Sequence, residues 1–61
     1  KMYTYQEIVN QFDIIENVYT DGKRVKVKGT QWGQSFLVNY DFKHTLVAQA
    51  VSDKIKNFIG V

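Results

Sequence analysis

A run of five residues alternates strictly between basic and apolar side chains: Arg24, Val25, Lys26, Val27 and Lys28. Successive side chains of a β-strand point to opposite faces, so this alternation predicts a strand with one buried face and one solvated face. Such strands are typical of antiparallel sheets that pack on a core with one side only. The pattern therefore predicts an open sheet covered by a layer on its valine side.

The segment before this strand is harder to interpret. Residues 18–20 favour a strand, whereas residues 13–17 fit either a helix or a strand. Asp21–Gly22 is a two-residue hairpin signal. A turn at these two residues would place Ile14 on the buried face, but it would also place the charged Glu16 there, which is unfavourable.

The segment after this strand predicts a second hairpin. Residues 29–33 include two glycines and a tryptophan and are predicted to form a loop. Residues 35–42 alternate again and predict another strand. One face of that strand carries its large apolar side chains, Phe36, Val38, Tyr40 and Phe42.

Both ends of the chain have helical patterns. Thr4 and Glu7 form a capping-box pattern at the start of a short helix expected over about residues 4–12, or to about residue 16. Asp41 or Thr45 is expected to cap a second helix, and Gly60 suits its C-terminal end. The apolar residues expected to face the core are Tyr5, Ile8, Val9 and Phe12 in the first helix, and Leu46, Val47, Ala50, Val51, Ile55, Phe58 and Ile59 in the second.

These segments predict one small α+β domain over residues 1–61, in the order helix, strand, strand, strand, helix. An antiparallel sheet of two or three strands would pack on two helices and leave its other face in water. With 44% hydrophobic and 23% charged residues, the composition is that of a globular domain and excludes a disordered tail.

The chain has no cysteine, so it can form neither a disulfide nor a cysteine-based metal site. A domain of about 60 residues buries only about 60% of the surface of its unfolded chain, so a homodimer or another partner is compatible with this size. No apolar run approaches the ~18 residues of a membrane span. We expect a cytoplasmic protein that does not contact a membrane.

Four of the eight basic residues lie within residues 23–28, which contain no acidic residue. Inward-facing valines would make the cations of this strand project together from the open face. Cations suit phosphates, amides suit hydrogen bonding and an indole suits base stacking. The predicted nucleic-acid-binding residues are Arg24, Lys26, Lys28, Gln31, Trp32, Gln34 and Lys43. The alternative is a solvated face whose lysines guard against edge pairing.

The sequence is compatible with two interpretations of Trp32, as an exposed binding residue or as a buried one. It lies between polar residues and glycine, which is typical of an exposed loop residue, and tryptophan is enriched at binding hot spots. It could equally fold back over the sheet edge as a lid on the core, because tryptophan is well buried on average.

The residues that catalysis requires are scarce. His44 is the only histidine, and general acid–base chemistry needs a matched partner such as Asp41 or Ser52. The acidic residues lack the spacing of a calcium loop, and the chain has neither a phosphate-binding glycine loop nor a nucleophile elbow. We therefore expect no enzyme activity, no metal and no cofactor.

The order of elements resembles the double-stranded-RNA-binding domain fold, and the chain is most similar to small HicA-type RNA-cleaving toxins. Residues 28–31 (Lys-Gly-Thr-Gln), followed by Phe36, lie where that family carries Gly-Ser-His and then Phe, and residues 55–61 look like the end of its last helix. The family's catalytic histidine falls on Gln31 or Trp32, and the lysine-rich start of the second helix is reduced to Lys43 and His44. The resemblance implies an RNA-facing sheet without nuclease activity.

Two functions are compatible with these observations. The first is a non-enzymatic nucleic-acid-binding module with a basic sheet face and an aromatic loop. The second is a small protein-binding inhibitor or accessory factor, of the type found in phages or mobile elements. That factor would contact a larger protein through a sheet edge or through the Trp32 loop.

Overall fold

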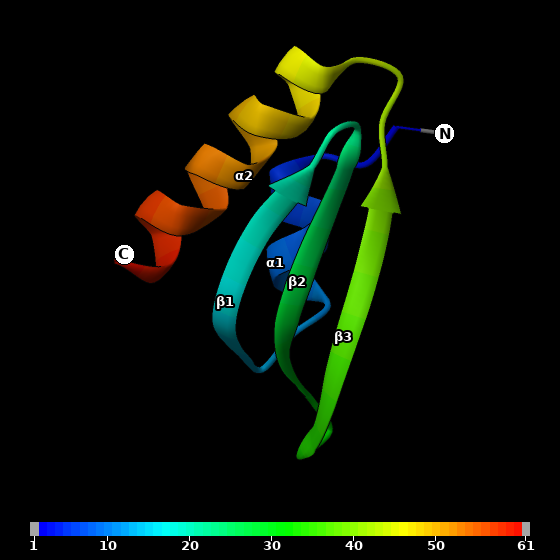
Figure 1. Cartoon of the computed structure of the whole chain (residues 1–61). Coiled ribbons are helices and arrows are strands. Elements are labelled where there is room, and N and C mark those ends of the chain that lie inside the picture. Colours follow the sequence, from blue (N-terminus) through cyan, green and yellow to red (C-terminus); the bar gives the residue numbers. More distant parts are fainter. Residues whose placement is uncertain (1, 61) are drawn as a thin grey trace.

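The computed structural model describes residues 2–60, which form an α+β domain with an antiparallel sheet of three strands and two helices (Figure 1). The elements are α1 (Tyr5–Asn10), β1 (Ile14–Asp21), β2 (Arg24–Gln31), β3 (Gln34–Asp41) and α2 (Thr45–Ile59). The strand order is β1-β2-β3, so β2 is the middle strand. The predicted fold class and order of elements are confirmed.

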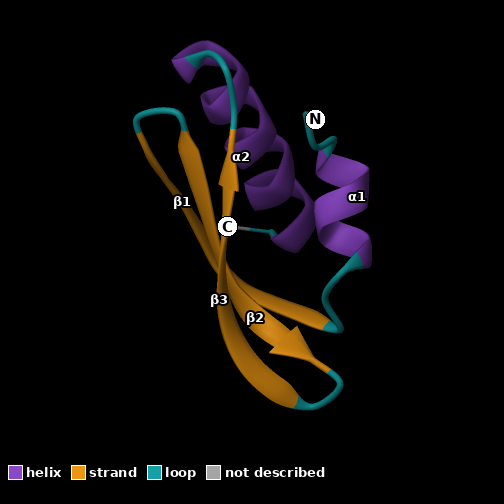
Figure 2. Cartoon of the chain, turned by 90° about the vertical axis from the view of Figure 1, so that its right-hand side faces the viewer, coloured by secondary structure: helices purple, strands orange, loops and turns teal. Residues whose placement is uncertain are grey.

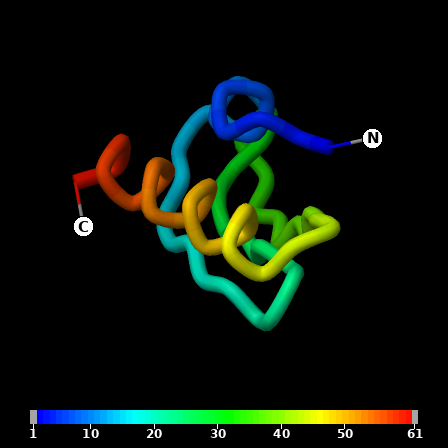
Figure 3. The backbone as a smooth tube through the Cα atoms, turned by 90° about the horizontal axis from the view of Figure 1, so that it is seen from above, coloured from blue at the N-terminus to red at the C-terminus, as the bar shows by residue number. Residues whose placement is uncertain are grey.

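Both helices lie on one face of the sheet, and the other face is open (Figure 2). Seen from above, α1 is viewed nearly end-on while α2 runs across the view, so the two helices are not parallel (Figure 3). The core lies between the sheet and the layer of two helices. Its fully buried apolar residues come from α1, β1, β2 and α2 and are Ile8, Val18, Val25, Val27, Ala48 and Ile55.

Helix α1 begins as the sequence predicts but ends earlier. The Thr4 hydroxyl accepts a hydrogen bond from the Glu7 amide at 3.2 Å, and the Glu7 carboxylate accepts one from the Thr4 amide at 3.0 Å. This capping box satisfies amides that have no partner within the helix. The chain leaves the helix at Gln11, and residues 14–17 belong to strand β1, so they do not extend the helix.

The first hairpin turns one residue later than predicted. Asp21 pairs with Arg24, so the turn residues are Gly22 and Lys23. Of these two, only Gly22 has a positive φ, at 62°. A glycine at the first turn position is the requirement of a type II′ hairpin turn, whereas a turn at Asp21–Gly22 would need positive φ at both residues.

A β-bulge at Glu16 turns the first residues of β1 to the opposite faces of the sheet from those predicted. The strand register shifts between Ile15 and Asn17, which leaves Glu16 exposed and away from the buried face on which the predicted turn would place it. The shift also turns Ile14 to the open face, where it is 63% exposed, and brings Ile15 against the core. An extra residue in one strand re-aims the side chains on one side of the bulge, and here it keeps the charge of Glu16 off the buried face.

Residues 29–31 belong to β2, not to the predicted loop. Gly29 lies under the bulged strand, and a Cβ atom there would be 2.3 Å from the carbonyl oxygen of Ile14 and 2.9 Å from a ring carbon of Phe12. Glycine is therefore required at this position by the close approach of β1, and not by a turn.

Helix α2 buries only part of the predicted stripe: Ile55 is buried, and Val47, Val51 and Ile59 pack against the core. Ala48, Ser52 and Ile55 are buried, whereas Leu46 is 83% exposed and Phe58 is 64% exposed. The residue before the helix is His44, which makes no side-chain capping bond, so neither Asp41 nor Thr45 caps the helix. The C-terminal end is as predicted, with Gly60 in the left-handed conformation at φ 81°.

The close packing around Gly29 leads us to expect that a larger side chain at this position destabilises the domain. Replacing Gly29 with alanine should destabilise the domain by about 2 kcal/mol or more, since the new methyl group meets backbone atoms. The matched control is Gly22→Ala, where nothing lies within 4 Å of the new Cβ atom and only the positive φ is unfavourable. That control should cost about 1 kcal/mol. Urea unfolding measures both, and equal losses would contradict the close approach at Gly29.

The buried phenol of Tyr40 leads us to expect that the domain loses stability at alkaline pH. Its side chain is buried, its hydroxyl donates to the Gln11 side-chain oxygen, and the Tyr3 ring packs edge-on at 4.9 Å. Burial raises the pKa of Tyr40 from 10.0 to about 12, with a smaller contribution from Tyr3. A raised pKa in the folded state stabilises the protein below the unfolded value, and this stabilisation is lost as the pH rises from 10.0 to about 12.

Urea midpoints measured across that interval should fall more steeply for the wild type than for Tyr40→Phe. The variant lacks the phenol whose ionisation favours unfolding. It should also be less stable at neutral pH, by about 1 kcal/mol, because its hydrogen bond to Gln11 is gone. Parallel pH curves for the two proteins would contradict this assignment.

Candidate functional site

The basic residues of β2 project from the open face of the sheet, as the alternation predicts. Val25 and Val27 have no exposed surface, and Lys26 lies between them on the opposite face. Arg24 and Lys28 are exposed on that same face. The neighbouring side chains of β1 and β3 on the open face are Asn17, Tyr19, Asp21, Leu37, Asn39 and Asp41.

Two of these three cations are already paired with carboxylates of the flanking strands. Arg24 Nε donates to Asp41 Oδ1 at 2.7 Å, and Lys26 Nζ lies 3.7 Å from Asp21 Oδ2. The hydrogen bond from Arg24 holds the pKa of Asp41 below its usual value, and the same contact raises the pKa of Arg24. Within residues 2–60, Lys28 is the β2 cation without such a partner.

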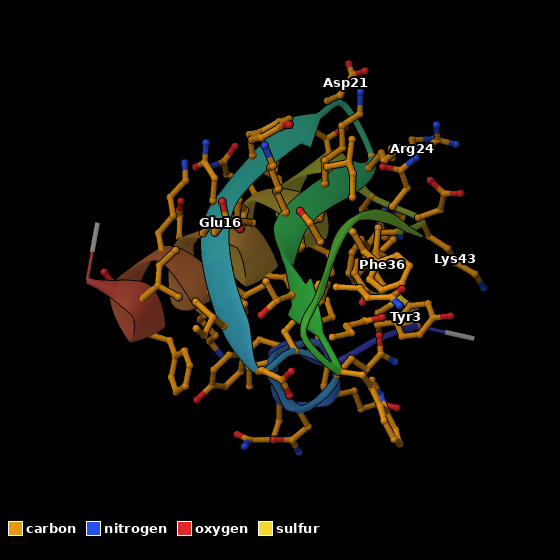
Figure 4. The ribbon with its side chains drawn as sticks, turned by 90° about the horizontal axis from the view of Figure 1, so that it is seen from below. Tyr3, Glu16, Asp21, Arg24, Phe36 and Lys43 are labelled. Atoms are coloured by element: carbon orange, nitrogen blue, oxygen red, sulfur yellow. The ribbon has the colours of Figure 1, made fainter. Side chains whose placement is uncertain are left out.

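The remaining predicted site residues lie at opposite ends of the sheet. Arg24 is at the end where β3 leads to Lys43, and Figure 4 shows both side chains, with Asp21, reaching outward. Trp32 is at the other end, beyond eight-residue strands that span about 25 Å. Gln31 and Gln34 pair with each other there, and alternation puts them on the helix-covered face. The seven residues therefore do not form one continuous site.

Trp32 is the most exposed large apolar residue of residues 2–60, with 94% of its surface accessible. It occupies the β2–β3 turn with Gly33, and both residues have positive φ, 56° and 78°. These are the conformations of a type I′ turn, in which Asn-Gly is the usual pair. A bulky side chain in the left-handed region costs about 1–2 kcal/mol. The lid interpretation is excluded.

The hairpin tip is held in place from the N-terminal side. The Gly33 amide donates to Asp13 Oδ2 at 3.3 Å, and the Asp13 amide donates to the Thr30 carbonyl at 2.8 Å. These bonds fix the turn to the segment between α1 and β1. The indole is therefore presented on an ordered support, with its ring faces and its N–H donor available to a partner.

An apolar groove between the helices was missed by the sequence analysis. It has a volume of about 420 Å³, and its walls include Tyr3, Tyr5, Leu46 and Ala50, with Lys54 at 5.6 Å from the centre of the Tyr5 ring. The spacing of residues 46, 50, 54 and 58 places them along one helix face. That spacing could have indicated the groove, but Leu46, Ala50 and Phe58 were assigned to the core.

The structure gives His44 no catalytic neighbours. It is exposed at the start of α2, and within residues 2–60 its side chain has no hydrogen-bond partner. No cluster of three potential metal ligands occurs in the described part of the chain. In that same part, neither helix has the length and apolar character that crossing a membrane requires.

Comparison of the chain with models of known protein families, with curated proteins and with solved structures gave no match. The arrangement of the side chains is therefore the basis for the proposals that follow.

The strained turn predicts that Trp32 is unfavourable for folding. Replacing it with asparagine should stabilise the domain by about 1 kcal/mol, because Asn-Gly is the preferred pair for a type I′ turn. The control is Trp32→Ala, which removes the indole but keeps a poorly suited residue at positive φ. Thermal unfolding of the three proteins measures the difference, and a destabilised Trp32→Asn variant would show that the indole supports the fold.

Proposed function

We propose that this chain is a protein-binding module that inserts Trp32 into an apolar pocket of a larger protein. The observation that carries the proposal is a 94% exposed tryptophan at a position of positive φ. Exposure and backbone strain both act against stability. Residues kept in strained conformations cluster at ligand clamps and other functional sites, where the strain is part of the mechanism.

The rigid hairpin favours such a contact energetically. A tryptophan buried at the centre of an interface commonly contributes about 2 kcal/mol or more. The two-residue turn and the bond from Gly33 to Asp13 hold the backbone of the tip, so little conformational entropy is lost when the partner binds. The partner would supply an apolar slot for the ring and an acceptor for the indole N–H.

Nucleic-acid binding by the basic strand stays a prediction, but the geometry favours it less. Arg24 and Lys26 already face carboxylates, and the carboxylate of Asp13 lies against the tip that carries Trp32. Phosphate contacts would have to displace or tolerate these negative charges. Lys28 is the β2 residue from which a phosphate contact would be easiest.

Affinity capture with three baits separates the two functions. The wild type, Trp32→Asn and Lys28→Gln would each be incubated with lysate of the source cells, with and without nuclease. We expect one protein to be retained after nuclease treatment by the wild type and by Lys28→Gln, but not by Trp32→Asn. Capture that needs intact nucleic acid and is lost in Lys28→Gln would support the basic-strand function instead.

Trp32 is the only tryptophan, so its fluorescence reports directly on the proposed contact. Adding the captured protein should shift the emission to shorter wavelength as the indole leaves water. The affinity should change little between 50 and 200 mM salt, because the contact is apolar. Nucleic-acid binding through three cations would instead weaken with a log–log slope of about −3. An unshifted emission would contradict insertion of Trp32.

A further inference from the structure

Strand β3 is a free edge of the sheet without the usual protection. It has eight residues, and those from Gln34 to Tyr40 carry no charge. The other edge strand, β1, is interrupted by the bulge at Glu16 and carries that residue's charge. Exposed edge strands ordinarily carry charges, prolines or bulges, because their unpaired backbone groups otherwise bind another strand.

The side chains of β3 are also incompletely covered on both faces. Helix α2 packs over β1 and β2. Phe36 on the helix side is 42% exposed, and Leu37 on the opposite, open face is 56% exposed. An added strand beside β3 would cover part of each side chain and would also pair the free backbone edge.

We propose that β3 pairs antiparallel with β3 of a second copy of this chain, forming a continuous six-stranded sheet with a two-fold axis at Val38. A second copy is the occupant that the charges favour. The strand is uncharged through residue 40, so two copies bring no like charges together. The Arg24–Asp41 ion pairs lie near the ends of the joined strands, far from the axis.

The backbone register identifies the groups that would pair. The Phe42 amide donates to the Lys23 carbonyl at 2.9 Å, and bonded pairs alternate along an antiparallel ladder. Residues 34, 36, 38 and 40 therefore direct their backbone groups to β2. The backbone groups of Ser35, Leu37, Asn39 and Asp41 point away from β2, to the free edge.

Pairing centred on Val38 uses all four of these residues in each copy. Leu37 then lies opposite Asn39 of the second copy, and Ser35 lies opposite Asp41. Ser35 and Asp41 share the open face of the sheet, where a hydroxyl can donate to a carboxylate. Centring the pair on Leu37 would leave Asp41 opposite the turn residue Gly33, so fewer backbone groups would find a partner.

A single cysteine tests both the pairing and its register. Val38 would face its counterpart across the axis as a non-bonded pair, with Cα atoms about 4.5 Å apart, which is within the range that a disulfide spans. The chain has no cysteine of its own. Val38→Cys treated with a mild oxidant such as oxidised glutathione should therefore form a covalent dimer. Ser35→Cys, whose thiols would lie about 20 Å apart, should not.

Sedimentation of the unmodified protein provides the second measurement. We expect the mass of two chains at high concentration, with at least tenfold weaker association in Leu37→Lys, which adds a charge near the axis. The matched control Ile14→Lys adds the same charge to the open face of β1 and should associate like the wild type. Trp32→Asn should also associate normally, so the dimer can be tested independently of the proposed partner contact.

Three results would overturn the proposal. A wild-type protein that stays monomeric up to about millimolar concentration would exclude a useful affinity. Disulfide formation by Ser35→Cys as readily as by Val38→Cys would exclude the register. Loss of association in Trp32→Asn would show that the copies meet through the hairpin tip and not through β3.

Discussion

Burial of Val25 and Val27 on the middle strand is the interaction on which the rest of this structure depends. Both side chains are fully covered, and hiding one such side chain is worth about 1.5–3 kcal/mol. Since β2 is paired on both sides, its orientation sets the facing of β1 and β3 as well. The same alternation that hides the valines directs the cations outward, so the open face is a direct consequence of core packing.

Local patterns predicted most of the fold. The capping box at Thr4, the alternation of β2 and the left-handed Gly60 each depend on residues close in sequence, and each is observed. The predictions were wrong where a contact between residues far apart in the sequence determines the local structure. Gly29 resembles a loop residue until β1 is placed against it, and the bulge at Glu16 is visible only from the pairing of β1 with β2.

The candidate site was predicted less well for the same reason. The sequence indicates that Arg24 and Lys26 share a face, but Asp41 is 17 residues from Arg24 and becomes its neighbour only through the β2–β3 register. The exposed apolar flank of α2 was misassigned because apolar residues lie on both sides of its buried stripe. The sequence singled out Trp32 as a candidate binding residue. It did not indicate the type I′ turn, because asparagine and not tryptophan is the usual residue at that position.

The meander order of the strands also bears on how fast this domain can form. Each strand pairs with its neighbour in sequence through a two-residue turn, so assembling the sheet closes only short loops. Short loops lose little chain entropy, and proteins dominated by local contacts fold faster than those with distant pairings. The contact between α1 and α2 spans the greatest sequence separation among the main packing contacts. Docking of the C-terminal helix is therefore the step in which most of the search time would be spent.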